Sequence, residues 1–242
     1  MSWASRLAHL LYPPACPLCH AALPDSPATQ PPICARCAEG LARVGRPLCV
    51  QCGVGLPGAF DALAWCQACR AHPRAFERAR AAWRYSGTGS AVVRQFKYHQ
   101  RWRLGRWLAA DMAATAQASL PVEEMTGIVP VPLHWAARRL RGGDPAKTLA
   151  VLVGHALGKP CWPRALRRRR WTPSQTRLSW RQRQRNVRGA FAADARLVRG
   201  RSLLLVDDVL TSGATAEACT EALIRAGARR VFVLTAARTP LA

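Results

Sequence analysis

The sequence predicts an α/β protein in which helices flank a mostly parallel sheet, with a small metal-binding module in front of it. Two observations carry this prediction. Four Cys-x-x-Cys pairs all lie before residue 70. After about Phe76, apolar runs of strand length alternate with amphipathic stretches of helix length, an order typical of a parallel sheet. We therefore divide the 242-residue chain into a double zinc-ribbon module, residues 1–75, and an α/β domain, residues 76–242.

The first module is defined by its cysteines. A two-residue gap lets one tight turn present two sulfurs to one ion, and structural Zn²⁺ prefers four ligands in a closed tetrahedral site. The pairs can be combined in three ways, and gaps of 14 and 13 residues favour sequential pairing. Disulfides are the weaker alternative, because no export signal accompanies these cysteines. We therefore predict two structural zinc ions, bound by Cys16, Cys19, Cys34 and Cys37 and by Cys49, Cys52, Cys66 and Cys69.

The second domain is read from its hydrophobic periodicity and its helix caps. Asp144-Pro145 is a strong helix start, an N-cap followed by proline at the first helical position, and Gly158 ends that helix. Cys219 falls on the apolar face of a later helix and is expected in the core. The expected elements are strand 81–85, helix 92–112, strand 127–133, the helix between Asp144 and Gly158, strand 202–206, helix 214–226 and strand 231–236.

The segment from Leu203 to Thr215 carries the clearest chemistry. An apolar run of strand length ends in Asp207 and Asp208, and a small turn containing Gly213 leads into a helix. Parallel sheets bind ligands at the carboxyl ends of their strands, and a helix N-terminus is a ready anion site. Because carboxylates repel phosphate, vicinal sugar hydroxyls are their natural partners. The pattern predicts a ribose 5-phosphate site; the alternative is an ordinary strand-to-helix connection with Asp and Thr as caps.

Net charge is the second large signal. The chain has 36 basic and 13 acidic residues, a formal net charge of +23, and nearly all of the basic residues are arginine. Such a field favours an acidic polymer or a phosphate-rich ligand, although an Arg-rich genomic composition could supply part of the excess. No apolar run approaches the roughly 18 residues that cross a bilayer. The start of the chain is too interrupted for a signal peptide and favours a brief helix with Trp3 and Leu7 on one face, so we expect a cytoplasmic protein without a membrane span.

Residues 164–188 form a basic arm with ten arginines and no acidic residue. Basic grooves with stacking aromatics hold single-stranded nucleic acid. Three interpretations stay open: a lid over pyrophosphate, a surface for single-stranded DNA, or a solvated charged segment whose tryptophans pack into the core. The candidate nucleic-acid-binding residues are Arg167, Arg168, Arg169, Arg170, Trp171, Arg177 and Arg181.

The segment VDDVLTSGAT resembles the 5-phosphoribosyl-1-pyrophosphate (PRPP) signature of type I phosphoribosyltransferases. From about residue 10 to residue 238 the chain resembles the ComF family of competence-associated proteins, which join an N-terminal zinc ribbon to a type I phosphoribosyltransferase-like domain. The matching stretches are the cysteine pairs, Phe96-Lys97-Tyr98, Val129-Pro130-Val131-Pro132, Arg141-Gly142, Gln175-Thr176, Arg185-Asn186-Val187, Gly189-Ala190-Phe191 and the Asp-Asp motif.

The resemblance implies roles for these residues. Asp207 and Asp208 would hold the ribose hydroxyls at the catalytic centre, and Mg²⁺ would bridge the hydroxyls and the pyrophosphate. Arg141 and Lys97 are candidates for binding the pyrophosphate charge. The loop expected to wrap the 5-phosphate of PRPP consists of Thr211, Ser212, Gly213, Ala214 and Thr215.

One stretch departs from the family. The family usually reads Arg-Gly-Phe-Asn-Gln-Ala after the second strand, whereas this chain reads Arg-Gly-Gly-Asp-Pro-Ala over residues 141–146. Asp144-Pro145 keeps the helix start, but proline cannot replace glutamine as a hydrogen-bonding group. If that loop contacts the pyrophosphate or an acceptor base, this chain binds its ligand differently or has lost turnover.

The leading hypothesis is therefore a ComF-like protein that binds PRPP or a related ribose phosphate and acts on or with single-stranded DNA in transformation or DNA utilisation. Competence or DNA-processing proteins would be its partners. As an enzyme it would displace pyrophosphate from the anomeric carbon of PRPP, and the sequence leaves open whether it turns over. The alternatives are a non-catalytic DNA- or protein-binding module that uses the pocket as a ligand sensor, and a nucleobase salvage phosphoribosyltransferase.

Overall fold

The central element is a four-stranded, fully parallel sheet. The computed structural model describes residues 14–24, 31–58, 64–99, 102–133, 139, 143–170 and 180–240. Along the sheet the strands run in the order β1 (Arg78–Arg84), β6 (Arg230–Arg238), β5 (Ser202–Leu210) and β2 (Gly127–Pro130). This arrangement confirms the predicted α/β class with a mostly parallel sheet.

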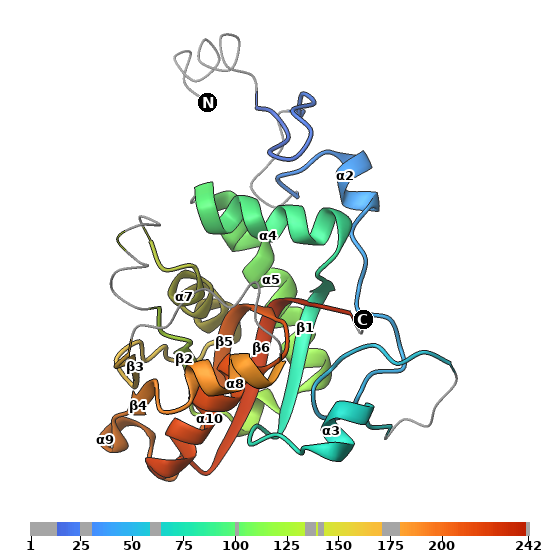
Figure 1. Cartoon of the computed structure of the whole chain (residues 1–242). Helices are drawn as coiled ribbons and strands as arrows, with labels where there is room; N and C mark the ends of the chain where they lie inside the picture. Colours follow the sequence, from blue (N-terminus) through green and yellow to red (C-terminus); the bar gives the residue numbers. More distant parts are fainter. Residues whose placement is uncertain are drawn as a thin grey trace.

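Helices cover both faces of the sheet (Figure 1). On one face lie α4, α5 and α7, and on the other lies α10 together with a two-stranded antiparallel sheet of β3 and β4. The remaining elements, with the 3₁₀ helix η1, are short. The bounds are α2 (Ala35–Glu39), α3 (Gln67–Ala71), α4 (Gly87–His99), α5 (Trp102–Ser119), η1 (Val122–Glu124), α7 (Pro145–Leu157), β3 (Leu166–Arg168), α8 (Trp180–Val187), β4 (Phe191–Ala193), α9 (Ala195–Val198) and α10 (Ala214–Arg225).

Alternation along the central strands separates two hydrophobic cores. Leu204 and Val206 of β5 point into the core under α4, α5 and α7, whereas Leu203 and Leu205 point into the core under α10. All four side chains are fully buried. Because both faces of the sheet are covered, the central strands β5 and β6 contain continuous apolar runs rather than alternating ones. The same alternation decides the directions of the two acidic residues that follow in β5.

Helix caps form where the sequence predicts them. The Asp144 carboxylate accepts a hydrogen bond from the Lys147 amide at 3.1 Å, Pro145 is the first residue of α7, and Gly158 ends the helix with φ of 63°. Gly158 has the left-handed conformation that favours glycine at a helix C-terminus. The core position expected for Cys219 on α10 is also confirmed, since its side chain is fully buried.

Several boundaries differ from the expectation. The single helix expected from 92 to 112 is two helices, α4 and α5, and the strand expected over 127–133 ends at Pro130. Strand β5 extends to Leu210, because Asp207 and Val209 continue the ladder with β6. The antiparallel pair of β3 and β4 was missed, because three-residue strands are too short to show periodicity. The helix expected near Trp3 lies outside the described residues.

The two cysteine-rich segments pack against different parts of the domain (Figure 1). The first lies beside α4, and just after it the Ala42 carbonyl accepts a hydrogen bond from the Arg84 amide at the end of β1 at 2.8 Å. The second lies beside β1, and its four cysteines share one hydrophobic core with α10. Because of this shared core, the boundary after residue 75 stays a proposal. Among the described helices, none combines the length and apolar character needed to span a membrane.

Candidate metal centres and sheet-edge site

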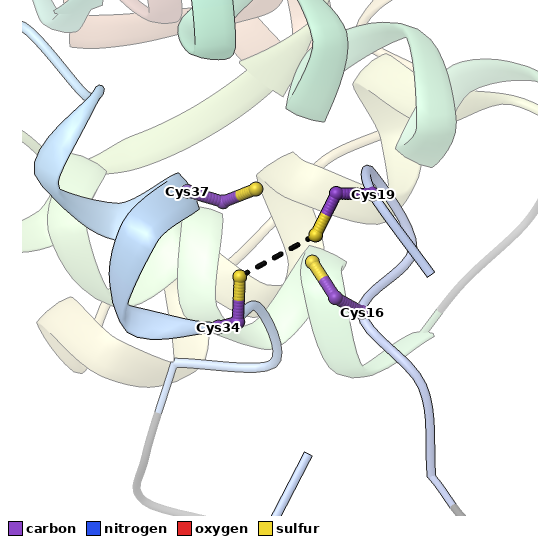
Figure 2. A group of neighbouring side chains, drawn as sticks. All are labelled: Cys16, Cys19, Cys34 and Cys37. Atoms are coloured by element: carbon purple, nitrogen blue, oxygen red, sulfur yellow. Dashed lines mark hydrogen bonds between the residues drawn. The ribbon is translucent and has the colours of Figure 1, made fainter. Parts of the chain in front are cut away.

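The eight paired cysteines form two separate clusters. In each cluster the four Sγ atoms lie within 4.8 Å of one another. The first cluster contains Cys16, Cys19, Cys34 and Cys37, and Figure 2 shows their sulfurs converging on one point. The second contains Cys49, Cys52, Cys66 and Cys69, all buried. The structure therefore confirms sequential pairing.

The sulfur spacing fits tetrahedral zinc. Zn–S bonds of about 2.3 Å place neighbouring sulfurs of a tetrahedron about 3.8 Å apart. The Cys19 and Cys34 sulfurs are 3.5 Å apart, and the Cys52 and Cys66 sulfurs are 3.7 Å apart. Each cluster supplies four thiolates and no open position, so the two zinc ions are structural.

The second ribbon is built into the domain through close backbone contacts. The Gln51 carbonyl accepts a hydrogen bond from the Ala79 amide of β1 at 2.7 Å, and the Gln51 side-chain amide donates to the Phe76 carbonyl at 3.2 Å. Gly53 has φ of +66°, and a Cβ there would lie 2.4 Å from the Ala79 carbonyl oxygen. Only glycine allows this close approach. The turn that carries Cys49 and Cys52 is therefore held directly on the edge strand of the sheet.

The carboxyl edge of the sheet gathers the acidic pair and a lysine. Asp208 points toward α4, where its carboxylate pairs with the Lys97 Nζ at 2.7 Å. The side chains of Lys97 and Asp208 are 22% and 9% exposed. Asp207 occupies the alternate strand position and points toward the α10 face, and its carboxylate accepts the Asp208 amide at 2.8 Å. The two carboxylates therefore diverge from a common backbone.

Asp207 lies in an environment that disfavours a charge. Burial and the nearby Asp208 carboxylate raise the pKa of Asp207 to about 8, and the Lys97 ammonium offsets only part of this effect. The Asp144 carboxylate at the start of α7 raises the pKa further. A carboxyl whose pKa is raised this far by burial and a neighbouring charge is a functional-site signal. Near neutral pH, Asp207 can change its protonation when a ligand binds.

The predicted phosphate loop adjoins this acidic pair. Gly213 is the N-cap of α10, with φ of 82° and no side-chain capping bond. The Ser212 hydroxyl accepts weakly from the Ala214 amide at 3.4 Å. Thr211 is exposed, and Thr215 lies in the first turn of α10. The N–H groups of a first helical turn have no intrahelical acceptor, so they point toward any anion bound at this edge.

The arginines predicted for nucleic-acid binding have different surroundings. Within the run Arg167–Arg170, the Arg168 guanidinium lies over the Phe191 ring at 5.4 Å, so it belongs to the packing of the small sheet. Arg170 is exposed but donates to the Asn186 carbonyl at 2.9 Å and so joins β3 to α8. The other two arginines of the run are exposed. Within the described part of the basic arm, residues 166–168 form β3 and residues 180–187 form α8.

Four predicted residues cannot be placed. Arg141, Trp171 and Arg177 lie outside the described residues, and for Arg181 the structure describes the backbone of α8 alone. Of the remaining predicted ligand residues, the structure brings Lys97, Asp208 and the loop after Leu210 to one edge of the sheet.

Two features were missed from the sequence. Arg238, at the end of β6, is buried and contacts both the second ribbon and the loop after β5. A groove of about 990 Å³ runs along α10, with arginines on its walls and the partly buried Glu217 among its lining residues. Neither belongs to a local motif, because the groove and the Arg238 contacts join residues far apart in the chain. The lining residues are His72, Arg185, Val187, Arg188, Gly189, Ala214, Glu217, Ala218, Glu221 and Arg225.

Comparison with known proteins agrees with this architecture. Residues 7–71 match the model of the double zinc ribbon domain. DNA utilization protein YhgH of Salmonella typhimurium is 33% identical over 211 residues, covering 86% of this chain and 90% of the relative. Competence protein F of Haemophilus influenzae is 29% identical over 158 residues, covering 62% of this chain and 67% of the relative.

The chain belongs to the ComF family. This membership confirms the resemblance drawn from the sequence. Among solved structures, the glutamine PRPP amidotransferase of B. subtilis is 24% identical with a TM-score of 0.36, covering 53% of this chain and 25% of that one. TT1426 of Thermus thermophilus is 19% identical with a TM-score of 0.33, covering 53% and 71%. As a ComF protein, the chain joins a double zinc ribbon to an α/β domain built on a parallel sheet.

Proposed function

We propose that the carboxyl edge of the sheet binds PRPP, or a related ribose phosphate, together with Mg²⁺, and that this ComF protein acts with single-stranded DNA in the cytoplasm. One observation carries the first part. Asp207, Asp208 and Lys97 lie beside the glycine-capped N-terminus of α10, at the edge where parallel sheets bind ligands. Acceptors for sugar hydroxyls and donors for a phosphate thus adjoin one another.

Each group would contact a different part of the ligand. The Asp207 and Asp208 carboxylates would accept hydrogen bonds from the ribose hydroxyls, while the amides of residues 211–215 would hold the 5-phosphate. Lys97 and Arg141 would bind the pyrophosphate, whose charge Mg²⁺ would offset. The Lys97–Asp208 pair of the free protein would then be loosened, and Asp207 would lose its proton to accept from a hydroxyl.

Calorimetry with PRPP and Mg²⁺ tests this binding. Asp207→Ala removes one acceptor at the site, and Asp194→Ala is a matched control, because Asp194 caps α9 and pairs with Arg196 away from the carboxyl edge. We expect binding by the wild type and the control, and at least a tenfold weaker affinity in Asp207→Ala. Absence of binding by the wild type would remove the proposal.

Turnover is a separate question with its own assay. Displacement at the anomeric carbon of PRPP releases pyrophosphate, so a release screen with nucleobases as acceptors detects a transferase. If pyrophosphate is released only when one particular acceptor is present, the protein is a transferase for that acceptor. If PRPP binds but no acceptor leads to release of pyrophosphate, the protein uses the pocket to sense its ligand. This second candidate function is favoured by the Gly143-Asp144-Pro145 stretch, which departs from the family pattern.

The distribution of arginines supports the DNA part of the proposal. The groove along α10 is bordered by the exposed Arg185 and Arg188 of the α8 end and by Arg225 of α10. Figure 1 shows α8 lying across α10, with β3 and β4 next to them. Exposed arginines on neighbouring elements match the phosphates of a nucleic-acid strand bidentately. The names of the relatives, DNA utilization protein and competence protein, agree with such a partner.

Fluorescence anisotropy with a labelled oligo-dT strand tests the DNA surface. In the double variant Arg185→Gln/Arg188→Gln we expect weaker binding and a smaller slope of log affinity against log salt, because two phosphate contacts are lost. The matched control is Arg103→Gln/Arg106→Gln, two exposed arginines of α5 on the other face of the sheet. Equal loss in both double variants would show that net charge alone attracts the strand, and would overturn this surface.

A further inference from the structure

The Arg238 guanidinium bridges the second ribbon and the loop after β5. Arg238 is the last residue of β6 and is 9% exposed. Its Nε donates to the Cys52 carbonyl oxygen at 3.3 Å, and its Nη2 lies 3.7 Å from the Cys52 Sγ. Its Nη1 donates to the Leu210 carbonyl at 2.9 Å and also to the Thr211 carbonyl. One planar group therefore holds two segments that are far apart in the chain.

The positive charge of Arg238 is compensated by the zinc-bound cysteine cluster of the second ribbon. Among the described residues, no carboxylate forms an ion pair with this guanidinium. A buried cation needs compensation, and four thiolates around one Zn²⁺ leave a net negative charge on the cluster. The Cys52 sulfur contributes part of that charge at the contact with Nη2. The zinc-bound second ribbon thus supplies the counter-charge for Arg238.

The other end of the guanidinium reaches the predicted phosphate loop. Leu210 ends β5 and Thr211 follows it, and only Ser212 separates Thr211 from Gly213, the residue that caps α10. Their two carbonyl oxygens point at the same Nη1 atom, which fixes the direction in which the chain leaves β5. A lysine carries the same charge but lacks the planar fork of donors, so it cannot hold both segments at once.

The turn at the other end is itself rigid. The Cys49 amide donates to the Val54 carbonyl at 2.8 Å, and the Gly53 amide donates to the Cys49 carbonyl at 3.0 Å. Together with the hydrogen bond from the Ala79 amide to Gln51, these contacts fix the turn against β1. A displacement of this turn is therefore transmitted through Arg238 rather than absorbed within the ribbon.

We propose that Arg238 is a positioning residue that couples zinc binding in the second ribbon to the conformation of the phosphate loop. Loss of that zinc ion removes the negative charge that compensates the Arg238 guanidinium at Cys52, releases Arg238 and leaves residues 210–215 less ordered. By reciprocity, a ligand held by the loop tightens zinc binding in the second ribbon. We expect this tighter binding to be observed as slower release of zinc. The ligand part of this inference rests on the proposed function, whereas the coupling between zinc and the loop does not.

Hydrogen exchange of the free protein tests the coupling without any ligand. The variant is Arg238→Lys, and the control is Arg80→Lys, because Arg80 donates to the Val50 carbonyl of the same ribbon at 3.2 Å without reaching the loop. We expect amides of residues 210–216 to exchange at least tenfold faster in Arg238→Lys and unchanged in Arg80→Lys. In the wild type, removal of zinc from the second ribbon by a chelator gives the same acceleration. This measurement on the wild type does not depend on the folding of any variant.

Zinc release to a chromogenic chelator tests the reciprocal effect. With saturating PRPP and Mg²⁺, we expect slower release from the second ribbon in the wild type and in Arg80→Lys, and no such slowing in Arg238→Lys. A purely structural role for Arg238 would lower the melting temperature but leave the ligand effect in place, and would overturn the coupling. Unchanged exchange of residues 210–216 after zinc removal would also overturn it. Failure of the wild type to bind PRPP would remove the proposed function, and the exchange experiment would still decide the coupling.

Discussion

Replacement of Lys97 by methionine probes the electrostatics of the sheet-edge site. The Lys97 Nζ lies 2.7 Å from the Asp208 carboxylate, and both side chains are largely buried. At an effective dielectric constant of about 20, this separation corresponds to about 6 kcal/mol of attraction. The cost of desolvating both charges offsets much of it. Removal of one partner leaves Asp208 uncompensated, so we expect Lys97→Met to lower the free energy of unfolding by about 2–3 kcal/mol.

A double-mutant cycle isolates the pair. The free energies of unfolding of the wild type, Lys97→Met, Asp208→Asn and the double variant are measured by urea denaturation at pH 7 with zinc present. We expect the double variant to be more stable than the sum of the single losses predicts, with a coupling energy of about 2 kcal/mol. Additive losses, or single losses below about 0.5 kcal/mol, would refute the argument, because they would mean that the pair behaves as a solvent-exposed one.

Three further predictions concern the carboxyl edge and the ribbons. The pKa of Asp207 is raised to about 8, so the folded protein retains a proton that the unfolded chain releases above about pH 4. This stabilisation is fully present below pH 4 and is lost as the pH rises from 4 to 8. The free energy of unfolding, measured by urea denaturation, should therefore decline less steeply with pH in Asp207→Asn than in the wild type, by up to about 1 kcal/mol per pH unit. Gly53→Ala should lower stability by about 2–4 kcal/mol and accelerate zinc release, because its Cβ would meet the Ala79 carbonyl oxygen at 2.4 Å. Zinc release to a chelator should be biphasic, with the first ribbon faster, because Cys19 is exposed and the second cluster is buried.

Each of these predictions has a control. A slope of stability against pH that is identical in the wild type and in Asp207→Asn would contradict the raised pKa. Gly45→Ala serves as the reference for Gly53, because a Cβ at Gly45 has no neighbour within 4 Å; equal losses in the two variants would contradict the close-contact argument. Cys19→Ser should abolish the fast phase of zinc release, and persistence of that phase would contradict its assignment to the first ribbon.

The zinc ribbons show how far a local pattern extends. The spacing of the cysteine pairs was sufficient to predict both clusters and their pairing, because a two-residue gap brings two sulfurs together whatever the rest of the chain does. It could not predict that the second cluster belongs to the core under α10 whereas Cys16 packs under α4. That difference depends on which face of the sheet each ribbon packs against, because both contact the edge strand β1.

The sheet-edge site likewise has a part that the sequence predicts and a part that only the tertiary structure shows. The apolar run before Asp207 and the glycine at the start of α10 predicted a strand, a loop and a helix, since each follows from local conformational preference. The partner of Asp208 was not predictable, because Lys97 is 111 residues earlier and meets it only when α4 packs on the sheet. The raised pKa of Asp207 likewise depends on burial that only packing creates.

By itself, the sequence determined the fold class, the two zinc centres, the starts of α7 and α10 and the chemistry available at the end of β5, because all of these depend on short spacings and on residue types. The tertiary structure alone decided the divergence of the two carboxylates, the groove along α10 and the position of Arg238 between Cys52 and Thr211. The physical reason is separation along the chain: no local pattern records that the end of β6 lies between a ribbon and a loop. Long-range packing brings those groups together.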